Sequence, residues 1–527
     1  MSAPLLNSTT HKHPFSLASF ADDALHYATQ KIVSTGYSPV AKIAQAAVVS
    51  VLKHITEGRL RIVASTEVFE FPPSVDDDVS DLRGEIRVIS DAFWVRLCTM
   101  GDLGFAEAYM YGDVECDDLI STFMIFIRNK DRISGLDSKM SWLFNLPQRL
   151  ASYRFLNSLS NSPSNISAHY DLSDGMFKAF LSEDMSYSCA IFSDLDGDLK
   201  QRPELGFTAS QIRKLTDASF VLSPLISPAT STPAMSPSTS ATTLPTPPLA
   251  DTLHAAQLRK LAHITGKASI RPGHRVLEIG CGWGALALHI ATTFPGTQVD
   301  ALTLSVHQHA HVARLVAAAG VQDRVRVHLL DYREMPAAWT GTFDRVVSVE
   351  MVEHLGAENV VAYWAAIDRV LKQRCGAGVV SSTTIPEARF EQYARQVDFI
   401  QKWSASPIFP GGLLPTPTLL LTSMAGASAG RLVVDSVSNI GPHYARTLRE
   451  WRRAFEVNFA DVEQALRMDH PGVFDGLSGQ RELAVFRRKW IYYFRYCEVG
   501  FTTRLLGNHI ITFTREGNEE FGFDIYE

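Results

Sequence analysis

The chain has 527 residues, 46% of them apolar, and a formal net charge of −7. This length exceeds one ordinary domain and allows a large buried core, so we expect two or three units. The acidic balance, together with the lack of a long basic run, argues against nucleic acid as a partner. Six cysteines occur without Cys-x-x-Cys pairs, so the sequence indicates neither a metal site nor a disulfide framework and fits a reducing compartment.

We expect no targeting signal in the first part of the chain. Residues 1–35 are rich in Ser, Thr and His without a clear period, which predicts a loose N-terminal leader. This leader lacks a charged segment followed by an apolar one, and no apolar stretch is long enough to cross a bilayer. We therefore predict a cytoplasmic protein without a signal peptide or transmembrane segment.

A small α+β domain is predicted over residues 36–150. Apolar positions from Ile43 to Ile55 recur at helical spacing; we interpret them as core packing, with membrane contact as the alternative. Short β-like runs at 60–63 and 85–89 come next, followed by alternating helix and turn.

The second domain is predicted over residues 165–515, interrupted by an insertion at 218–250. No charged residue occurs between Asp217 and Asp251, and Ser, Thr, Pro and Ala dominate. Such a segment cannot bury enough apolar surface to offset its ordering entropy, so we expect it to be disordered. Its Ser-Pro and Thr-Pro pairs are candidate phosphorylation sites, but a tolerated surface insertion is the simpler interpretation.

Strands and helices alternate after the insertion. Strands are predicted at 275–279, 298–304, 325–330, 343–349 and 377–383, and helices at 285–293, 307–318 and 358–371. This order predicts an α/β, Rossmann-like domain whose mostly parallel central sheet is covered on both faces. Ligands of such sheets bind at the carboxyl ends of the strands, so we expect the site residues just after each strand.

A glycine loop, Gly280-Cys-Gly-Trp-Gly284, follows the first of these strands and opens a helix. This pattern indicates a nucleotide-type cofactor, either a dinucleotide or S-adenosylmethionine (SAM), with a purely structural strand-turn-helix as the third alternative. Glu278 lies inside the strand before the loop, and Asp300 comes early in the next strand rather than at its end. Both features favour SAM over NAD, because the SAM sulfonium and amino group require a nearby carboxylate and no pyrophosphate site.

Several separate segments match one family in the right order. They are His169-Tyr-Asp-Leu-Ser173, Met185-Ser-Tyr-Ser-Cys-Ala190, Leu258-Arg-Lys260, the glycine loop, Thr303-Leu-Ser305, Glu353-His354, Ile408-Phe-Pro-Gly-Gly412 and Asn439-Ile-Gly-Pro-His-Tyr444. The chain thus resembles the cyclopropane-fatty-acyl-phospholipid synthases and mycolic acid cyclopropane synthases over about 55–515. The resemblance implies a SAM-dependent methyltransferase domain preceded by a small N-terminal domain.

The resemblance also implies a reaction. A methylene group from SAM is added across the cis double bond of an unsaturated phospholipid acyl chain, which gives a cyclopropane fatty acid. The double bond is the nucleophile, the resulting carbocation needs shielding from water, and a bound bicarbonate is the implied base.

Site residues follow from the matched motifs. The resemblance implies catalytic roles around bicarbonate for Glu353, Cys189, Tyr444, Thr383 and Ile385, with the carboxylate of Glu353 orienting the anion. It implies SAM contacts for Tyr187, Ser188, Gly280, Gly282, Gly284, Thr303, Leu304, Gln308, Asp331 and Tyr332. Asp300 is then structural. Without the resemblance, a small buried residue at Cys189 and a core aromatic at Tyr444 are the favoured interpretations.

Three departures from the family pattern bear on function. Thr383 replaces a bicarbonate-binding histidine of bacterial members, and 404–407 is an apparent insertion beside the expected acyl pocket. Glu350 replaces a glycine, which places two carboxylates one turn apart and favours a perturbed pKa.

Substrate access and oligomeric state complete the predictions. The segment 486–496 combines aromatic residues and cations at helical spacing. The family resemblance makes part of it a wall of the acyl pocket, and the alternative is an ordinary packed helix. A basic and aromatic surface on this segment would favour docking on anionic lipid. We expect phospholipid acyl chains at a membrane surface as substrate, peripheral binding and a possible homodimer. The alternatives are C-methylation of another unsaturated lipid, including a sphingolipid, or of a small molecule, and an inactive lipid-binding protein.

Overall fold

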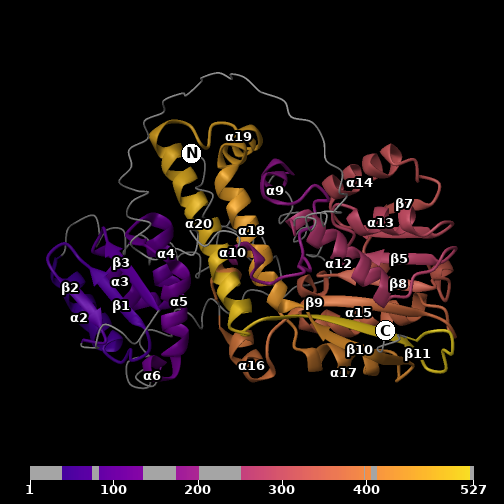
Figure 1. Ribbon diagram of the computed structural model, residues 1–527, viewed down its shortest axis with the longest axis horizontal. Helices are drawn as coiled ribbons and strands as arrows, with labels where there is room; N and C mark the ends of the chain where they lie inside the picture. The colour runs from indigo at the N-terminus through magenta and orange to yellow at the C-terminus, as the bar shows by residue number, and fades with distance from the viewer. Residues whose placement is uncertain are drawn as a thin grey trace, which may run out of the picture.

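The computed structural model describes residues 38–73, 82–134, 174–200, 251–396, 398–404 and 412–522 (Figure 1). The predicted leader 1–35, the motif 169–173, the insertion 218–250 and most of the segment 404–412 lie outside the described residues.

The first part of the chain forms an α+β unit, as predicted. Its four-stranded sheet has the order β2-β1-β3-β4, with β1 and β3 parallel and the other pairs antiparallel. The strands are β1 Arg59–Val63, β2 Val68–Phe71, β3 Arg83–Val88 and β4 Val114–Cys116, and the helices are α2 Ser38–Leu52, α3 Ala92–Met100, α4 Asp102–Tyr111, α5 Leu119–Arg128 and α6 Lys130–Ser134.

Most of the apolar positions predicted at helical spacing between Ile43 and Ile55 face the core. Val48, Leu52 and Ile55 are buried, which confirms core packing at three of the predicted positions, and Ala47 and Val51 are partly buried. Ile43 is the exception, because 72% of its surface is exposed. Among the residues described, no helix combines the length and apolar character needed to cross a bilayer.

The second part is built on a seven-stranded sheet with the order β10-β11-β9-β8-β5-β6-β7. Its strands are β5 Arg275–Ile279, β6 Gln298–Thr303, β7 Val325–Leu329, β8 Arg345–Val349, β9 Ala377–Thr384, β10 Leu432–Asn439 and β11 Gly507–Arg515. The first five are parallel and lie where the sequence predicts them, whereas β11 is antiparallel to both β9 and β10. This confirms the mostly parallel Rossmann-like sheet.

Helices cover both faces of this sheet because its strands are apolar on both sides. Val276 and Val299 point to one face, which packs against α12 Leu253–Lys267, α13 Ala285–Thr293 and α14 Val306–Ala318. Leu277, one residue after Val276, and Leu302, three residues after Val299, point to the other face, where α15 Val360–Val370 and α17 Pro417–Ala427 lie.

Three further helices, α18 Gly441–Val457, α19 Phe459–Asp469 and α20 Gly476–Thr502, lie between the N-terminal unit and the sheet (Figure 1). The shorter helices are α9 Asp174–Phe180, α10 Gly197–Lys200 and α16 Glu387–Arg395. Helix α20 packs on α18 and also on α4 and α5. It therefore joins the two parts of the molecule.

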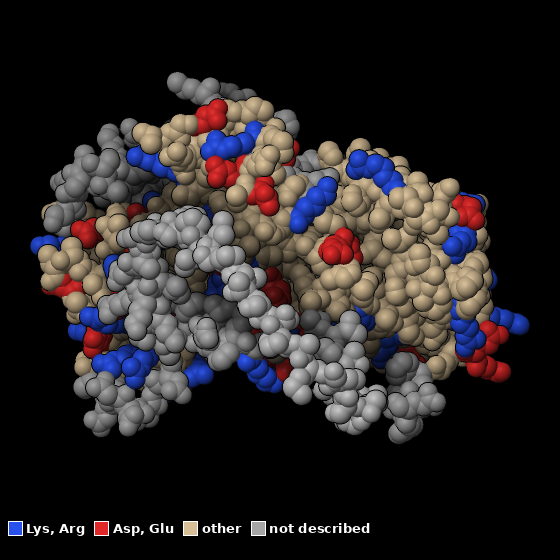
Figure 2. All heavy atoms as spheres, turned by 45° about the horizontal axis from the view of Figure 1, so that its top comes forward, with Lys and Arg blue, Asp and Glu red and all other residues tan. Residues whose placement is uncertain are grey.

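The predicted aromatic surface on α20 is not formed. Trp490, Tyr493 and Phe494 are at most 4% exposed and pack within the core. Arg487 lies over the ring of Phe459 instead of forming a basic face with these aromatics. On the face drawn in Figure 2, basic and acidic side chains of the described residues are interspersed.

Candidate active site

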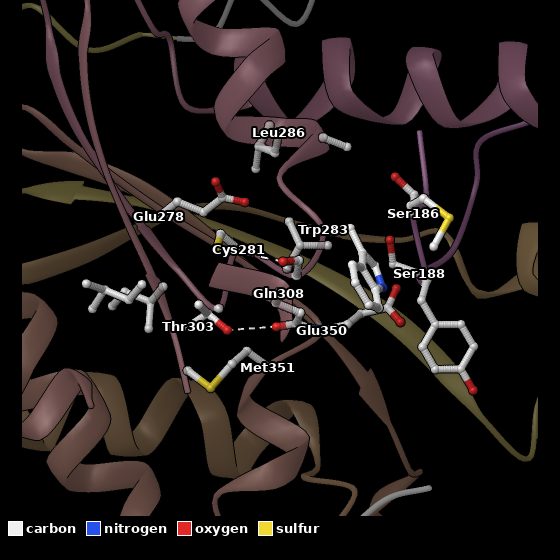
Figure 3. Close-up of a pocket in the computed structure, with 18 of the residues that line it drawn as sticks. Ser186, Ser188, Glu278, Cys281, Trp283, Leu286, Thr303, Gln308, Glu350 and Met351 are labelled. Atoms are coloured by element: carbon white, nitrogen blue, oxygen red, sulfur yellow. Dashed lines mark hydrogen bonds between the residues drawn. The ribbon is translucent and has the colours of Figure 1, made fainter. Parts of the chain in front are cut away.

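A cavity opens at the carboxyl ends of the parallel strands, where the sequence predicts the site (Figure 3). The glycine loop after β5, the ends of β6 and β8, and the segment after α9 form its walls. The lining includes eight of the ten predicted SAM residues: Tyr187, Ser188, Gly280, Gly282, Thr303, Leu304, Gln308 and Tyr332. Gly284 and Asp331 are not among the lining residues.

The two outer glycines of the loop serve different purposes. Gly280 has φ +82°, and a Cβ at this position would lie 2.6 Å from Cγ of Met351, so the loop needs glycine here to approach the end of β8. Gly284 has φ +90°, and its Cβ would lie 2.7 Å from Cγ1 of Val312 on α14. Gly280 therefore shapes the cavity, whereas Gly284 allows helix packing behind it.

The end of β6 offers hydroxyl and amide groups to the cavity. Thr303 Oγ1 donates to Oε1 of Gln308 at 2.7 Å, the interaction drawn as a dashed line in Figure 3. Ser305 caps α14 by accepting from the Gln308 backbone N–H, which fixes that residue in the first turn. The buried Nε2 of Gln308 has no hydrogen-bond partner in the described part of the chain. It is thus a donor available to a ligand.

The segment after α9 faces the loop from the other side (Figure 3). Ser188 Oγ accepts from Nζ of Lys260 at 2.9 Å, and its carbonyl accepts from Nε2 of Gln257 at 2.9 Å. Lys260 is 3% exposed. Burial lowers the pKa of its ammonium, while the charges of Asp184 and Glu350 oppose that shift.

Glu278 supplies a buried carboxyl group to the same cavity. Burial raises its pKa to about 8, against the opposing effects of Lys260 and the Ala287 backbone N–H. Its Oε2 is buried without a hydrogen-bond partner among the described residues. A ligand with a positive charge would satisfy this oxygen and favour ionisation.

Two acidic residues near the cavity have structural roles. Both oxygens of Asp331 accept hydrogen bonds from Arg333, and the carboxylate caps the turn at 332–334, so it does not line the cavity as predicted for a SAM contact. Asp300 pairs with Arg275 and His328 at 2.9 Å each. This confirms the structural interpretation of Asp300 and removes the acid that a dinucleotide ribose would need.

A second group of polar residues meets at Glu350, just beyond the end of β8. Glu350 Oε1 accepts from the Cys189 backbone N–H at 2.8 Å and from Nδ2 of Asn508 at 2.9 Å. Its Oε2 accepts from the Tyr444 hydroxyl at 2.8 Å. Glu350 also lines the cavity, so this cluster borders the cofactor site.

Glu353, the predicted catalytic carboxylate, lies behind this cluster. It is 6% exposed, does not line the cavity, and its Oε1 accepts from the Thr383 backbone N–H at 2.5 Å. The side chain of Thr383 accepts a long hydrogen bond of 3.5 Å from Asn508, which links it to Glu350. The Ile385 backbone N–H donates to the Pro415 carbonyl and is not directed at the cluster.

These contacts do not fit the predicted bicarbonate. The Cys189 N–H and the Tyr444 hydroxyl, two of its expected donors, already bind the Glu350 carboxylate. The Ile385 N–H, a third, binds Pro415. The sequence did point to Glu350 as a departure from the family pattern, but it gave no signal for Asn508.

The electrostatics of the two glutamates differ. Burial raises the pKa of Glu350, but hydrogen bonds from Cys189, Tyr444 and Asn508, together with the charge of Lys260, oppose this shift. Burial and then the Glu350 charge raise the pKa of Glu353 to about 8. The three hydrogen-bond donors and Lys260 thus favour the charged form of Glu350, whereas the Glu350 charge disfavours the charged form of Glu353.

Aromatic rings surround the Glu350 cluster. Tyr444 stacks on Phe501 with 4.4 Å between centroids and meets Trp451 edge-on at 5.9 Å. Trp451 also lies 5.0 Å from the ring of Tyr187, whose hydroxyl is 3.1 Å from that of Tyr493. Electron-rich faces thus continue from the cofactor cavity into the interior.

The sheet order, the glycine loop and the cavity at the strand ends define a SAM-dependent methyltransferase, and Glu278, Gln308 and the glycine loop fit that cofactor. The family model for mycolic acid cyclopropane synthetase matches residues 157–218 and 247–510. The chain therefore belongs to the mycolic acid cyclopropane synthetase family.

Relatives extend over most of the chain. Tuberculostearic acid methyltransferase UfaA1 of Mycobacterium tuberculosis is 32% identical over 81% of this chain and 82% of its own. The cyclopropane-fatty-acyl-phospholipid synthase of Escherichia coli is 28% identical over 82% of this chain and 88% of its own. The crystal structure of coclaurine N-methyltransferase, 17% identical, covers 78% of this chain and 99% of its own with a TM-score of 0.51, a likeness of fold alone.

Proposed function

We propose that the protein transfers the methyl carbon of SAM, as a methylene group, to the cis double bond of an unsaturated phospholipid acyl chain. The observation that carries this proposal is the Glu350 cluster, which lies beside the cofactor cavity and within an aromatic wall. Bound SAM supplies an electrophilic methyl group, and an alkene needs no base to attack it. The carbocation left on the acyl chain needs exclusion of water, electron-rich surfaces and a proton acceptor, and these residues offer all three.

Mass spectrometry of the lipid product tests this proposal. Purified protein is incubated with SAM and vesicles of unsaturated phospholipid, and the fatty acids are analysed as methyl esters. We expect a product one CH₂ heavier that mild hydrogenation leaves unchanged and forcing hydrogenation opens to a methyl-branched chain. The absence of any heavier product would refute the proposal.

C-methylation of another unsaturated lipid, including a sphingolipid, or of a small molecule is the second candidate. It is favoured by Thr383, which stands where the family pattern has a histidine, and by the relative named tuberculostearic acid methyltransferase. In this case the cation loses a proton without closing the ring, and the product takes up hydrogen under mild conditions. A lipid-binding protein without catalysis would differ from both, because calorimetry would detect no binding of SAM.

We further propose that the acyl chain is reached from a membrane surface, to which the protein binds peripherally. Since Trp490, Tyr493 and Phe494 are buried, docking must use side chains other than these aromatic residues of α20. Flotation with anionic vesicles tests the association, and protein that stays at the bottom of the gradient would contradict it. Homodimer formation stays a prediction, which mass photometry would check.

A further inference from the structure

Glu350 holds an unusual backbone conformation. Its φ is +50°, in the left-handed region, although it is not glycine. For a residue with a Cβ this conformation costs about 1–2 kcal/mol, and it persists where the surroundings enforce it, often at functional sites. Here it turns the side chain from the end of β8 toward Cys189 and Tyr444.

The three hydrogen bonds to Glu350 form a complete carboxylate site. One comes from the backbone of the segment after α9, one from α18 through Tyr444, and one from β11 through Asn508. All three donors are fixed by secondary structure or burial, since Tyr444 is 9% and Asn508 0% exposed. A carboxylate and a bicarbonate are both planar and carry one negative charge shared by two oxygens on the same carbon; the third oxygen of bicarbonate, its hydroxyl, stands where the carboxylate has its side-chain carbon. The side chain therefore fills the role for which the sequence predicts a bound anion.

We propose that the Glu350 carboxylate is the base that removes the proton from the newly transferred methyl group, so that the reaction needs no bicarbonate. This role of Glu350 rests on the proposed function. Glu350 suits this role better than Glu353, because Glu350 lines the cavity and Glu353 does not. Glu353 is a positioning residue that holds Thr383 and, through it, Asn508.

The step balances without a further reactant. The π electrons of the alkene form a bond to the methyl carbon while the C–S bond of SAM breaks, its electron pair stays on sulfur, and the positive charge moves to the acyl chain. A C–H bond of the new methyl group then gives its proton to an oxygen of Glu350. The electrons of that C–H bond close the third side of the ring. The protonated carboxyl afterwards loses its proton to solvent.

Measurements with and without dissolved CO₂ test this assignment. Full-length wild type, Glu350→Gln, Glu350→Gly and, as a matched control, the exposed Glu358→Gln are assayed with SAM and unsaturated phospholipid vesicles in degassed buffer, with or without added sodium bicarbonate. Calorimetric binding of SAM and thermal melting establish that each variant is folded.

We expect bicarbonate to change the wild-type rate by less than about twofold. Glu350→Gln should lose at least about 100-fold in rate, within the range of a general base, while its Kd for SAM stays within about threefold of wild type. Bicarbonate should restore activity to Glu350→Gly at least about tenfold, because the side chain then leaves room for the anion among Cys189, Tyr444 and Asn508. Glu358→Gln should behave as wild type.

Two outcomes would overturn the assignment alone. One is a wild-type rate that falls more than about tenfold on removal of CO₂ and returns with bicarbonate. The other is a Glu350→Gln variant that keeps more than about a tenth of the wild-type rate. By contrast, a wild-type protein that makes no methylated lipid under either condition would refute the proposed function and the assignment with it.

Discussion

Replacing Glu278 with glutamine should change the pH dependence of stability in a defined direction. The side chain is 4% exposed, and burial raises its pKa from the ordinary 4.5 to about 8. The folded protein thus holds this proton more tightly than the unfolded chain does. Its contribution to stability is fully present below pH 4.5 and is lost as the pH rises through about 8.

The size of the effect follows from the two pKa values. A tenfold difference in proton affinity corresponds to about 1.4 kcal/mol, so ionising Glu278 in the cofactor-free protein costs about 5 kcal/mol in full and about 3 kcal/mol at pH 7. Glutamine cannot ionise and escapes this cost. The free energy of unfolding of Glu278→Gln, relative to wild type, should therefore increase by several kcal/mol between pH 5 and pH 9.

Urea unfolding of the cofactor-free proteins at one-unit pH steps measures this difference. Asp300→Asn is the matched control, because Asp300 is a buried acid on the neighbouring strand that pairs with Arg275 and His328 outside the cavity. Its loss should destabilise the protein by an amount that stays nearly constant over the same pH range. A flat difference for Glu278→Gln would refute the reasoning.

Binding of SAM should respond in the opposite sense to stability. Hydrogen bonds to charged groups contribute about 1.5–3 kcal/mol, so Glu278→Gln should weaken SAM binding roughly 10- to 100-fold in calorimetry at pH 8. Asp300→Asn should keep the wild-type affinity within about threefold. Wild-type affinity in Glu278→Gln would show that this carboxyl does not contact the cofactor.

Three further substitutions test separate parts of the structure. Gly280→Ala should weaken SAM binding at least about tenfold by calorimetry, because its Cβ would lie 2.6 Å from Met351 Cγ and its φ is +82°; unchanged affinity would contradict this view of the loop. Tyr444→Phe removes a hydrogen bond that lowers the pKa of Glu350, so kcat should fall and the acidic limb of the pH–rate profile should move to higher pH. An acidic limb that does not move would show that the Tyr444 hydroxyl does not set the pKa of the base. Trp490→Ala should cost about 3–5 kcal/mol in urea unfolding while SAM affinity stays the same, and a small cost would mean that α20 is not part of the core.

The parallel strands could be predicted because each is a short apolar run followed by a turn and a helix. The two antiparallel strands could not. Along β10 only Leu432 is buried, so the strand lacks the alternation that reveals a half-buried strand. Strand β11 inserts between β9 and β10 although Thr383 and its partner Asn508 are far apart in the chain. Such pairing depends on tertiary contacts that no local pattern contains.

The active site, like the sheet, has one part that could be predicted from local sequence and one part that could not. The cofactor half depends on a contiguous loop and on strand ends, and local sequence is enough to place Gly280 and Thr303. The other half gathers Cys189, Tyr444 and Asn508 from three distant segments around one of two nearby glutamates. The backbone at Glu350 decides which glutamate reaches them, and its positive φ leaves no mark on composition or spacing.

The charges around the cavity explain why these two halves belong together. Glu278 and Glu350 are lining residues, and Glu353 lies directly behind them, whereas Lys260 is the one Lys or Arg among the described lining residues. Burial raises the pKa of all three carboxyl groups, so one ammonium cannot keep them all ionised. A cofactor that carries a sulfonium and an amino group supplies the missing positive charge. In the proposed reaction the positive charge moves to the acyl chain once the methyl group is transferred, and the three donors at Glu350 favour the charged form of the carboxyl group beside it.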